Sequence, residues 1–581
     1  MSAQEERTAL TSRLSLYERA LRAPEEDALP DEPPEPEGPG LRGRKAAAAV
    51  RASLGPLLAG PDTPAALDEL HRRLAELPVR TGPLVAAVLS VPLDDEAAAR
   101  AIGRRLVRTG TARRSVSLGV ALLRRLGGPE DVPCLVVLSR LRRLSRLAVT
   151  ALERLDPRTA ALRWLDIRVR GPELRPLVDA LLSDPVPDVR ELLIRQPLDA
   201  RTVGPATARR IAEATGLAAL LDRGPVDPRL LAQAARLLVR MASQQDYEAE
   251  VLHYGEAVAA CDALVRRAPA LPPSVGHAAV LLSLAVDLHS GPTHLLPWRD
   301  GQREQLLDAL GALLASPAWA HTLSEAAADA PPAVRRRAAW LRHTAEQVFR
   351  APEPPATRLR IEILSRDPAD ATERVETRFL IDGRPLVPEV FGRGSGNPPE
   401  YFLDRGALRA GEEPREVQLA EAWCTEGCCG ALWVTVVREG DQVVWRDWRH
   451  PGRLPSGAPA PELPVYRFDA AGYDAELARA AGDDRWSWPA RTTGRLLAAA
   501  LRDRPELLAR WEARFDWAGA DYRDPDTTAV WFRGACATGS DEPGPQFVWR
   551  LPEDGTPPAE RAAAGLRRIE REDPRGYAGP P

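Results

Sequence analysis

The spacing of apolar residues between positions 44 and 350 constrains the fold of this chain more than any other feature. Apolar side chains recur there at alternating intervals of three and four residues, which places one apolar stripe on each helix. Two such series are Leu141, Leu144, Ala148, Ala151 and Leu155, and Leu231, Ala234, Leu238 and Met241. The period-two alternation typical of strands is essentially absent from this region. We therefore predict an all-helical domain over residues 44–350.

Proline and aspartate punctuate this helical region at regular intervals. Aspartate is a favoured N-cap and proline cannot continue a helix, so pairs such as Asp156-Pro157 and Asp227-Pro228 separate one helix from the next. Successive helical hairpins of similar size are typical of a repeat array. A compact helical domain without repeats is the alternative that the pattern leaves open.

One hairpin carries the turn of a known type of repeat. An Asp-Pro turn there precedes a Val-Arg pair that opens the second helix; the residues are Asp184, Pro185, Val189 and Arg190. The segment resembles a HEAT-like (armadillo-type) helical repeat, and the resemblance covers about residues 60–350. It implies an α-solenoid, in which stacked hairpins present an extended binding surface.

The chain ahead of this region divides into two short segments. Residues 1–23 are predicted to form a short N-terminal helix. Residues 24–43 are rich in proline and acidic residues, and residues 1–40 together carry a net charge of −6. Proline removes backbone donors and like charges repel, so we predict an acidic linker.

The composition changes after the proline-rich linker at residues 351–357. Ten of the fourteen tryptophans lie between Trp423 and Trp549. Short alternating runs predict strands, two of which flank a Glu439-Gly440-Asp441 turn. The predicted strands are 358–364, 375–381, 431–438, 443–448, 530–532 and 547–550, and the predicted helices are 491–516 and 558–571. Residues 358–581 are thus predicted to form a Trp-rich α+β domain with a mainly antiparallel sheet.

Three cysteines form the most unusual local pattern, Cys424-x3-Cys428-Cys429. Thiolates suit Zn²⁺, a structural zinc site takes four nitrogen or sulfur ligands, and His450 ends the following hairpin. We therefore consider a zinc site of Cys424, Cys428, Cys429 and His450. On a strand, however, adjacent Cys428 and Cys429 would point to opposite faces. A redox or nucleophilic thiol, and ordinary cysteines without a ligand, are the alternatives.

The same segment resembles part of an uncharacterised bacterial domain. The residues that carry the resemblance are Cys424, Cys428, Cys429, Gly430, Val443, Val444 and Trp445. It implies one recurring domain over about residues 358–480 and brings no activity with it.

Arginine clustering and two tryptophans give candidate binding residues. Residues 100–175 have a local net charge of +12, whereas the whole chain carries −4. A stacked helical array could align these arginines into a strip that attracts phosphates or an acidic protein. The candidate binding residues are Arg104, Arg105, Arg108, Arg113, Arg114, Arg140, Arg142, Arg143, Arg146, Trp486 and Trp488. For the tryptophans, core packing is the alternative.

Complete catalytic motifs are missing from the sequence, so we lean toward a protein that is not an enzyme. The segment Gly392–Asn397 is neither a P-loop nor a nucleophile elbow. The N-terminus has no secretory pattern and no apolar run reaches the roughly 20 residues of a membrane span, so we expect a cytoplasmic protein without a membrane contact.

We therefore predict a scaffold that binds a protein partner through a helical-repeat surface. The alternatives are nucleic-acid binding through residues 100–175, and an enzyme or zinc-binding module centred on the three cysteines.

Overall fold

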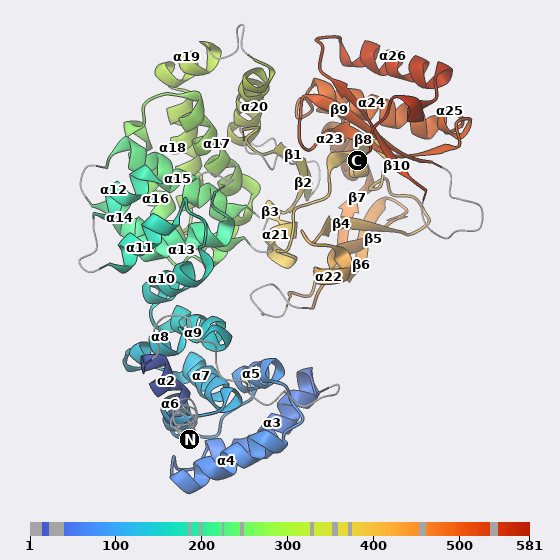
Figure 1. The fold of residues 1–581 in the computed structure, drawn as a ribbon. Helices are drawn as coiled ribbons and strands as arrows, with labels where there is room; N and C mark the ends of the chain where they lie inside the picture. Colours follow the sequence, from blue (N-terminus) through green and yellow to red (C-terminus); the bar gives the residue numbers. More distant parts are fainter. Residues whose placement is uncertain are drawn as a thin grey trace. The chain divides into compact units, whose positions relative to one another are not determined.

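A computed structural model describes residues 14–22, 40–183, 188–196, 198, 202–223, 226–243, 249–325, 331–350, 358–369, 375–452, 460–534 and 544–580. The chain forms two compact units. Unit 1 contains Met1–Pro197 and Arg210–Leu220, and unit 2 contains Leu198–Arg209 and Leu221–Pro581 (Figure 1). Most of the predicted acidic linker and all of the linker 351–357 lie outside the described residues.

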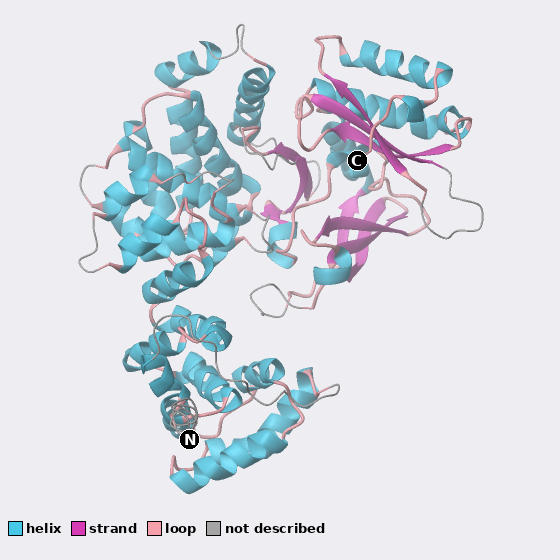
Figure 2. Ribbon diagram, in the orientation of Figure 1, coloured by secondary structure: helices cyan, strands magenta, loops and turns pink. Residues whose placement is uncertain are grey.

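The described part of unit 1 contains helices joined by loops and no strand, as predicted (Figure 2). Its helices are α2 (Leu16–Arg22), α3 (Gly43–Leu58), α4 (Pro64–Glu76), α5 (Thr81–Ser90), α6 (Glu96–Thr109), α7 (Arg113–Leu126), α8 (Val132–Leu138), α9 (Arg142–Leu155), α10 (Pro157–Arg168), α11 (Arg175–Leu182) and α12 (Val189–Arg195). Helices α13 (Pro205–Thr215) and α14 (Leu217–Asp222) contribute residues to both units.

Local signals set the helix ends in unit 1. At the start of α10, Asp156 Oδ1 accepts a hydrogen bond from the backbone N–H of Thr159 at 3.0 Å. Pro157 fits the first helical position because its missing N–H has no partner there in any case. The predicted boundary at Asp156-Pro157 is therefore confirmed.

The predicted apolar stripe of α9 is buried. Leu144, Ala148 and Ala151 have no exposed surface and pack into one core with residues of α7 and α8. Two glycines bring α6 and α7 close together: a Cβ on Gly119 would lie 2.9 Å from the carbonyl oxygen of Gly103. Small residues thus set the separation of these helices.

Of the predicted N-terminal helix, residues 14–22 are described, and they contain helix α2, Leu16–Arg22. Its buried residues Leu16 and Ala20 pack against α6 and α8.

Unit 2 combines helices with three small antiparallel sheets, so the predicted helical region followed by an α+β region is confirmed (Figure 2). Its first helices are α15 (Pro228–Ala242), α16 (Ala257–Arg267), α17 (Val275–Ser290), α18 (Gln302–Leu314), α19 (Pro317–Glu325) and α20 (Pro332–Phe349). The sheets have the strand orders β1-β2-β3, β4-β5-β6-β7 and β10-β9-β8.

The strands are β1 (Leu359–Ser365), β2 (Val375–Ile381), β3 (Arg384–Pro385), β4 (Arg415–Glu421), β5 (Ala431–Glu439), β6 (Gln442–Arg449), β7 (Tyr466–Asp469), β8 (Ala513–Ala520), β9 (Thr527–Gly534) and β10 (Gln546–Pro552). The helices among them are α21 (Leu386–Val390), α22 (Glu426–Cys429), α23 (Ala470–Gly482), α24 (Pro489–Asp503), α25 (Glu506–Ala509) and α26 (Pro558–Arg571).

Most predicted strands are confirmed, and one predicted helix is wrong. The β5–β6 hairpin turns at Gly440, whose φ of 65° suits glycine. The predicted helix 491–516 ends at Asp503, because Pro505 follows, and its last residues belong to strand β8. Strands β3, β4, β7 and β8 were not predicted.

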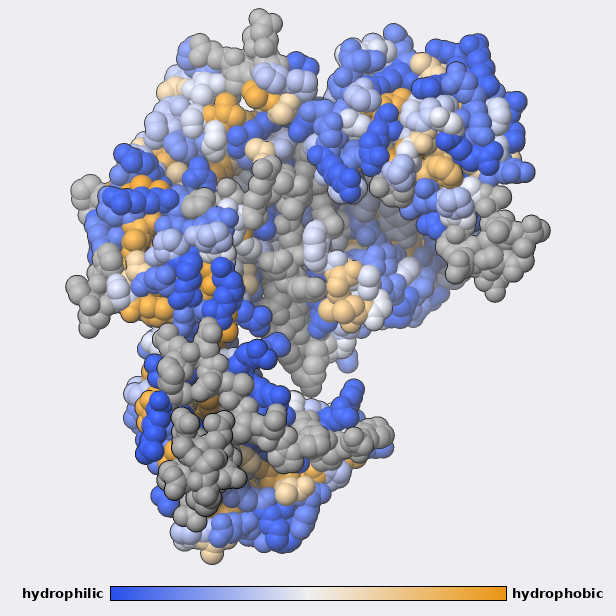
Figure 3. All heavy atoms as spheres, in the orientation of Figure 1, coloured by the Kyte–Doolittle hydropathy of each residue, from blue (hydrophilic) through white to orange (hydrophobic). Residues whose placement is uncertain are grey.

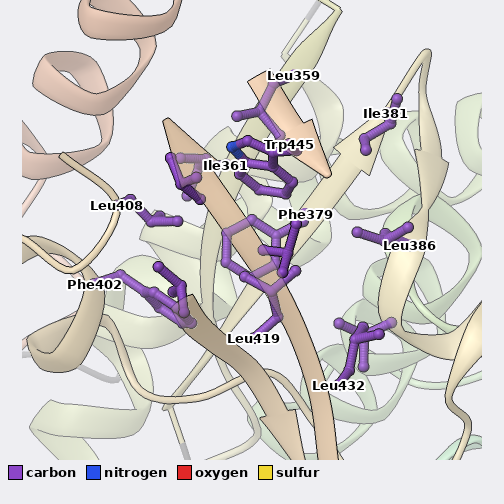
Figure 4. Close-up of a cluster of buried hydrophobic side chains, with 14 of the residues drawn as sticks. Leu359, Ile361, Phe379, Ile381, Leu386, Phe402, Leu408, Leu419, Leu432 and Trp445 are labelled. Atoms are coloured by element: carbon purple, nitrogen blue, oxygen red, sulfur yellow. The ribbon is translucent and has the colours of Figure 1, made fainter. Parts of the chain in front are cut away.

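The first two sheets share one core, which Figure 4 shows. Trp445 of β6 lies at its centre with no exposed surface. Its ring is 5.9 Å from that of Phe379 on β2 and 5.6 Å from that of Phe468 on β7. Edge-to-face contacts of this kind add to the energy of burial.

The other face of the β1–β2 sheet is charged and packs against α17. Arg378 of β2 is 7% exposed, and its Nη2 lies 3.3 Å from Asp287 of α17 and 2.5 Å from Glu376. On the neighbouring strand, Glu362 Oε1 is 2.9 Å from His289 Nε2. The helical and strand parts of unit 2 therefore meet through buried ion pairs.

We expect the stability of unit 2 to fall as the pH rises through the pKa of His289. Glu362 raises this pKa above 6.5, against the lowering by burial and by Arg378 and Arg303. The charged imidazole of His289 stabilises the folded state fully when the pH is below the pKa of this histidine in the unfolded chain. This stabilisation is lost when the pH rises above its pKa in the folded protein. Burial raises the pKa of Glu362, but His289 and Arg378 hold it at about 2, so its carboxylate stays ionised throughout this window.

Urea unfolding of the wild type and H289Q checks this expectation. The stability difference between the two proteins should be larger at pH 6 than at pH 9. An equal difference at both pH values would contradict it.

Hydrophilic side chains cover much of the surface drawn in Figure 3, with apolar residues in smaller patches. None of the described helices combines the length and the apolar character that a membrane span requires.

Candidate functional site

The three cysteines lie on the connection between β4 and β5. The backbone N–H of Ala422 donates to the carbonyl of Gly430 at 3.0 Å, which closes residues 422–430 into a loop. Within this loop α22 ends at Gly430, whose φ is 93°. A Cβ there would lie 2.6 Å from the ring of Pro451, so the loop needs glycine at this position.

The loop brings the three sulfur atoms together. The Sγ atoms of Cys424, Cys428 and Cys429 all lie within 4.8 Å of one another. The Sγ atoms of Cys428 and Cys429 are 3.8 Å apart. The expectation that these two neighbours would point to opposite faces of a strand is wrong, because both lie on a helical turn. The sulfurs of Cys428 and Cys429 can therefore reach the same metal ion, which they could not do on a strand.

The neighbouring thiols shift the pKa values of Cys424 and Cys429 in opposite directions. Burial raises the pKa of Cys424, but hydrogen bonds from Cys429 and Cys428 and from the backbone lower it overall. The hydrogen bond to Cys424 raises the pKa of Cys429 to about 11. The pair therefore favours a thiolate at Cys424 with neighbouring S–H groups as donors, and a thiolate is the form that binds metals.

Polar contacts fix the short helix that carries two of the cysteines. Glu426 Oε1 accepts from Trp433 Nε1 at 2.9 Å and from Arg449 at 3.2 Å. The Arg449 guanidinium lies over the Trp433 ring, 4.8 Å from its centroid. Arg393 Nη1 donates to the carbonyl of Cys429 at 3.2 Å. These contacts hold α22 against the β4–β5 pair.

The glycine-rich segment Gly392–Asn397 supports the same region. A Cβ on Gly394 would lie 2.1 Å from the carbonyl oxygen of Glu421, and one on Gly396 would lie 2.0 Å from that of Thr377. Backbone approach this close admits only glycine. The segment therefore packs between β2 and β4.

His450 does not join the three sulfurs. It follows β6 next to Pro451, and its Nδ1 is 2.9 Å from the carbonyl oxygen of Pro451. Among the described residues, the group of ligand atoms close enough to share a metal ion contains only the three cysteines. Cys536, a further cysteine that could contribute a ligand, lies outside the described residues.

The nine candidate arginines divide into two groups. In the first, Arg104 Nε pairs with buried Asp131 at 2.8 Å, and Arg114 Nη2 donates to the carbonyl of Leu77 at 3.1 Å. Half-buried Arg113 belongs to the same group. The exposed group comprises Arg105, Arg108, Arg140, Arg142, Arg143 and Arg146, of which Arg140 also contacts the carbonyl of Ala20.

The two candidate tryptophans have internal partners. Trp486 is 4% exposed, and its Nε1 donates to the carbonyl of Asp483 at 2.7 Å. Half-buried Trp488 donates to the carbonyl of Pro525 at 2.6 Å. Arg491 lies 5.3 Å from the ring centroid of each. These contacts agree with the core-packing alternative, and the binding role stays a prediction.

Unit 2 contains a cleft of about 1630 Å³ that was not predicted from the sequence. It is lined by His289, Glu362, His294 and Arg303, among others. His294 Nδ1 lies 3.0 Å from Arg303 Nη1 and 2.9 Å from the carbonyl oxygen of His289, and burial lowers the pKa of His294. His289 and Glu362 are 73 residues apart in the chain, and no local pattern links them.

Comparison of the chain with known protein families, with curated proteins and with solved structures finds no match.

Proposed function

We propose that the α+β part of the chain binds a thiophilic metal ion, zinc first, through Cys424, Cys428 and Cys429. The observation that carries the proposal is the 3.8 Å separation of the Cys428 and Cys429 sulfurs within a three-sulfur group. Zinc–sulfur bonds of about 2.3 Å in a tetrahedron place neighbouring sulfurs about 3.8 Å apart. The cysteine geometry thus agrees with zinc coordination with little rearrangement.

The protonation of the cluster supports the same proposal. The lowered pKa of Cys424 favours a thiolate there, and zinc binding would displace the proton of Cys429, whose pKa is raised to about 11. Three protein ligands leave the fourth position to water or to a group of another molecule. Open fourth positions are typical of zinc sites with an exchangeable ligand.

Metal analysis tests this proposal. Protein purified without chelators should contain about one zinc per chain, and C424S, C428S and C429S should each lose most of it. C261S is the matched control, because Cys261 is a buried thiol outside the cluster and should leave the zinc content unchanged. Less than about 0.3 zinc per wild-type chain after reconstitution would refute the zinc site.

We also propose that unit 1 serves as an interaction scaffold for an acidic protein partner. The support is the group of exposed arginines on α6 and α9, together with the HEAT-like resemblance around α11 and α12. An exposed set of guanidinium groups attracts carboxylates and steers association.

Affinity purification of nuclease-treated extracts with the wild type and R142E/R143E/R146E tests the scaffold. The expected result is a partner that the wild type retains and the variant loses. A partner lost on nuclease treatment would favour the predicted nucleic-acid role instead.

A further inference from the structure

The β8–β9–β10 sheet has two unlike faces. One face packs against α24 and α26, with Val530, Phe532 and Trp549 in the core. Side chains alternate along a strand, so the residues between these lie on the opposite face. That face carries two tryptophans, Trp517 and Trp531, which are paired across β8 and β9.

The strand register gives the opposite face three rows. The central row contains Trp517, Trp531 and Val548; the outer rows contain Arg514, Arg533 and Gln546, and Gly519, Ala529 and Arg550. Three arginines therefore share this face with two tryptophans that are neighbours in the strand register.

Trp517 lies along the sheet surface. It is 43% exposed, which is the largest exposed fraction among the described tryptophans. A Cβ on Gly519, two residues away, would lie 2.6 Å from its ring. The ring therefore covers Gly519, and glycine at this position leaves room for the ring to lie on the strands.

The arginines keep donors available. Arg533 Nε contacts Asp516 at 2.6 Å and Arg550 Nε contacts Asp521 at 2.8 Å, and both arginine side chains are 35% exposed. Each guanidinium has five N–H donors, so one such contact leaves others for a ligand. Arg514 is exposed and has no ion pair within the described part of the chain.

We propose that this face of the β8–β9–β10 sheet binds single-stranded nucleic acid. Bases stack on Trp517 and Trp531, and the phosphates contact Arg514, Arg533 and Arg550. Aromatic rings on an antiparallel sheet, flanked by cations, suit unpaired bases because every base has a π-face. This surface belongs to unit 2 and is distinct from the arginines of residues 100–175.

An acidic peptide would satisfy the arginines equally well, but it offers no planar rings to the paired indoles. The two exposed residues after β8 extend the same chemistry: Tyr522 is 66% exposed, and Arg523 lies 5.1 Å from its ring centroid.

Fluorescence anisotropy with a labelled oligothymidylate tests the proposal on the full chain. Because a stacked base contributes about 1–3 kcal/mol, W517A should raise the Kd roughly 5- to 150-fold. R514A removes one phosphate contact and should reduce the slope of log Kd against log salt by about 0.7. R384A is the control, because Arg384 is an exposed arginine of β3 that pairs with Glu389, and it should bind as the wild type does.

Three results would overturn the proposal. The first is wild-type protein that binds no oligothymidylate, and the second is W517A and R514A with unchanged affinity and salt slope. The third is equal affinity for duplex DNA, in which the bases cannot reach the rings. None of these results depends on zinc, so the metal proposal is tested separately.

Discussion

Replacing Arg378 with methionine should lower the free energy of unfolding of unit 2 by about 3–5 kcal/mol. Arg378 is 7% exposed, and its guanidinium contacts the carboxylates of Asp287 and Glu376. It also donates to the carbonyl of Val286 at 3.1 Å and to Ser290 Oγ at 3.2 Å. Methionine would fill similar space but leave two buried carboxylates without their cation.

Tryptophan fluorescence during urea unfolding measures this loss, because every tryptophan except Trp164 lies in unit 2. R384M is the matched control: Arg384 is on the next strand, pairs with Glu389 and is 59% exposed. Exposed pairs contribute about 0–1 kcal/mol, so R384M should unfold close to the wild type. An R378M midpoint that matches the R384M midpoint would contradict the importance of the buried pairs.

The same interface shows why part of the fold could not be predicted from the sequence. The helices could be, because their signals are local: Asp156 caps α10, and Leu144, Ala148 and Ala151 lie on one buried stripe. The alternation in β1 likewise identified a strand. It did not show that Glu362 is buried, since the histidine that pairs with it is 73 residues away.

Strand β8 was missed for a different reason. The helical pattern of α24 continues through Leu507 and Leu508, so the sequence suggested one long helix. Glu512, with a φ of 53°, marks the change of direction before β8. The strand itself contains alanine and glycine, which have low strand propensity and give no period-two signal. Its partner β9, rich in β-branched and aromatic residues, was predicted.

Only part of the cysteine site could be predicted from the sequence. The sequence pattern identified the three thiols as candidate ligands. We expected Cys428 and Cys429 to lie on a strand, where their side chains would point to opposite faces. Their convergence depends on the four-residue helix α22, which ends at Gly430. The fourth predicted ligand, His450, lies beyond the hairpin, and spacing along the chain does not determine where its ring is directed. Local pattern thus identifies ligand types, and the loop conformation determines which of them converge.

Replacing Trp445 with alanine should destabilise unit 2 by about 3–5 kcal/mol, because large-to-small changes in a core lose burial and leave a cavity. Trp445 has no exposed surface, and its ring centroid lies within 6.4 Å of those of Trp448 and Tyr473. Its Nε1 also donates to the Tyr473 hydroxyl at 3.4 Å. The same urea unfolding experiment measures the loss.

W445F retains most of the apolar volume and should cost less, and W517A, at an exposed tryptophan, should cost less than about 1 kcal/mol. Equal losses in W445A and W517A would show that Trp445 does not anchor the shared core of the two sheets.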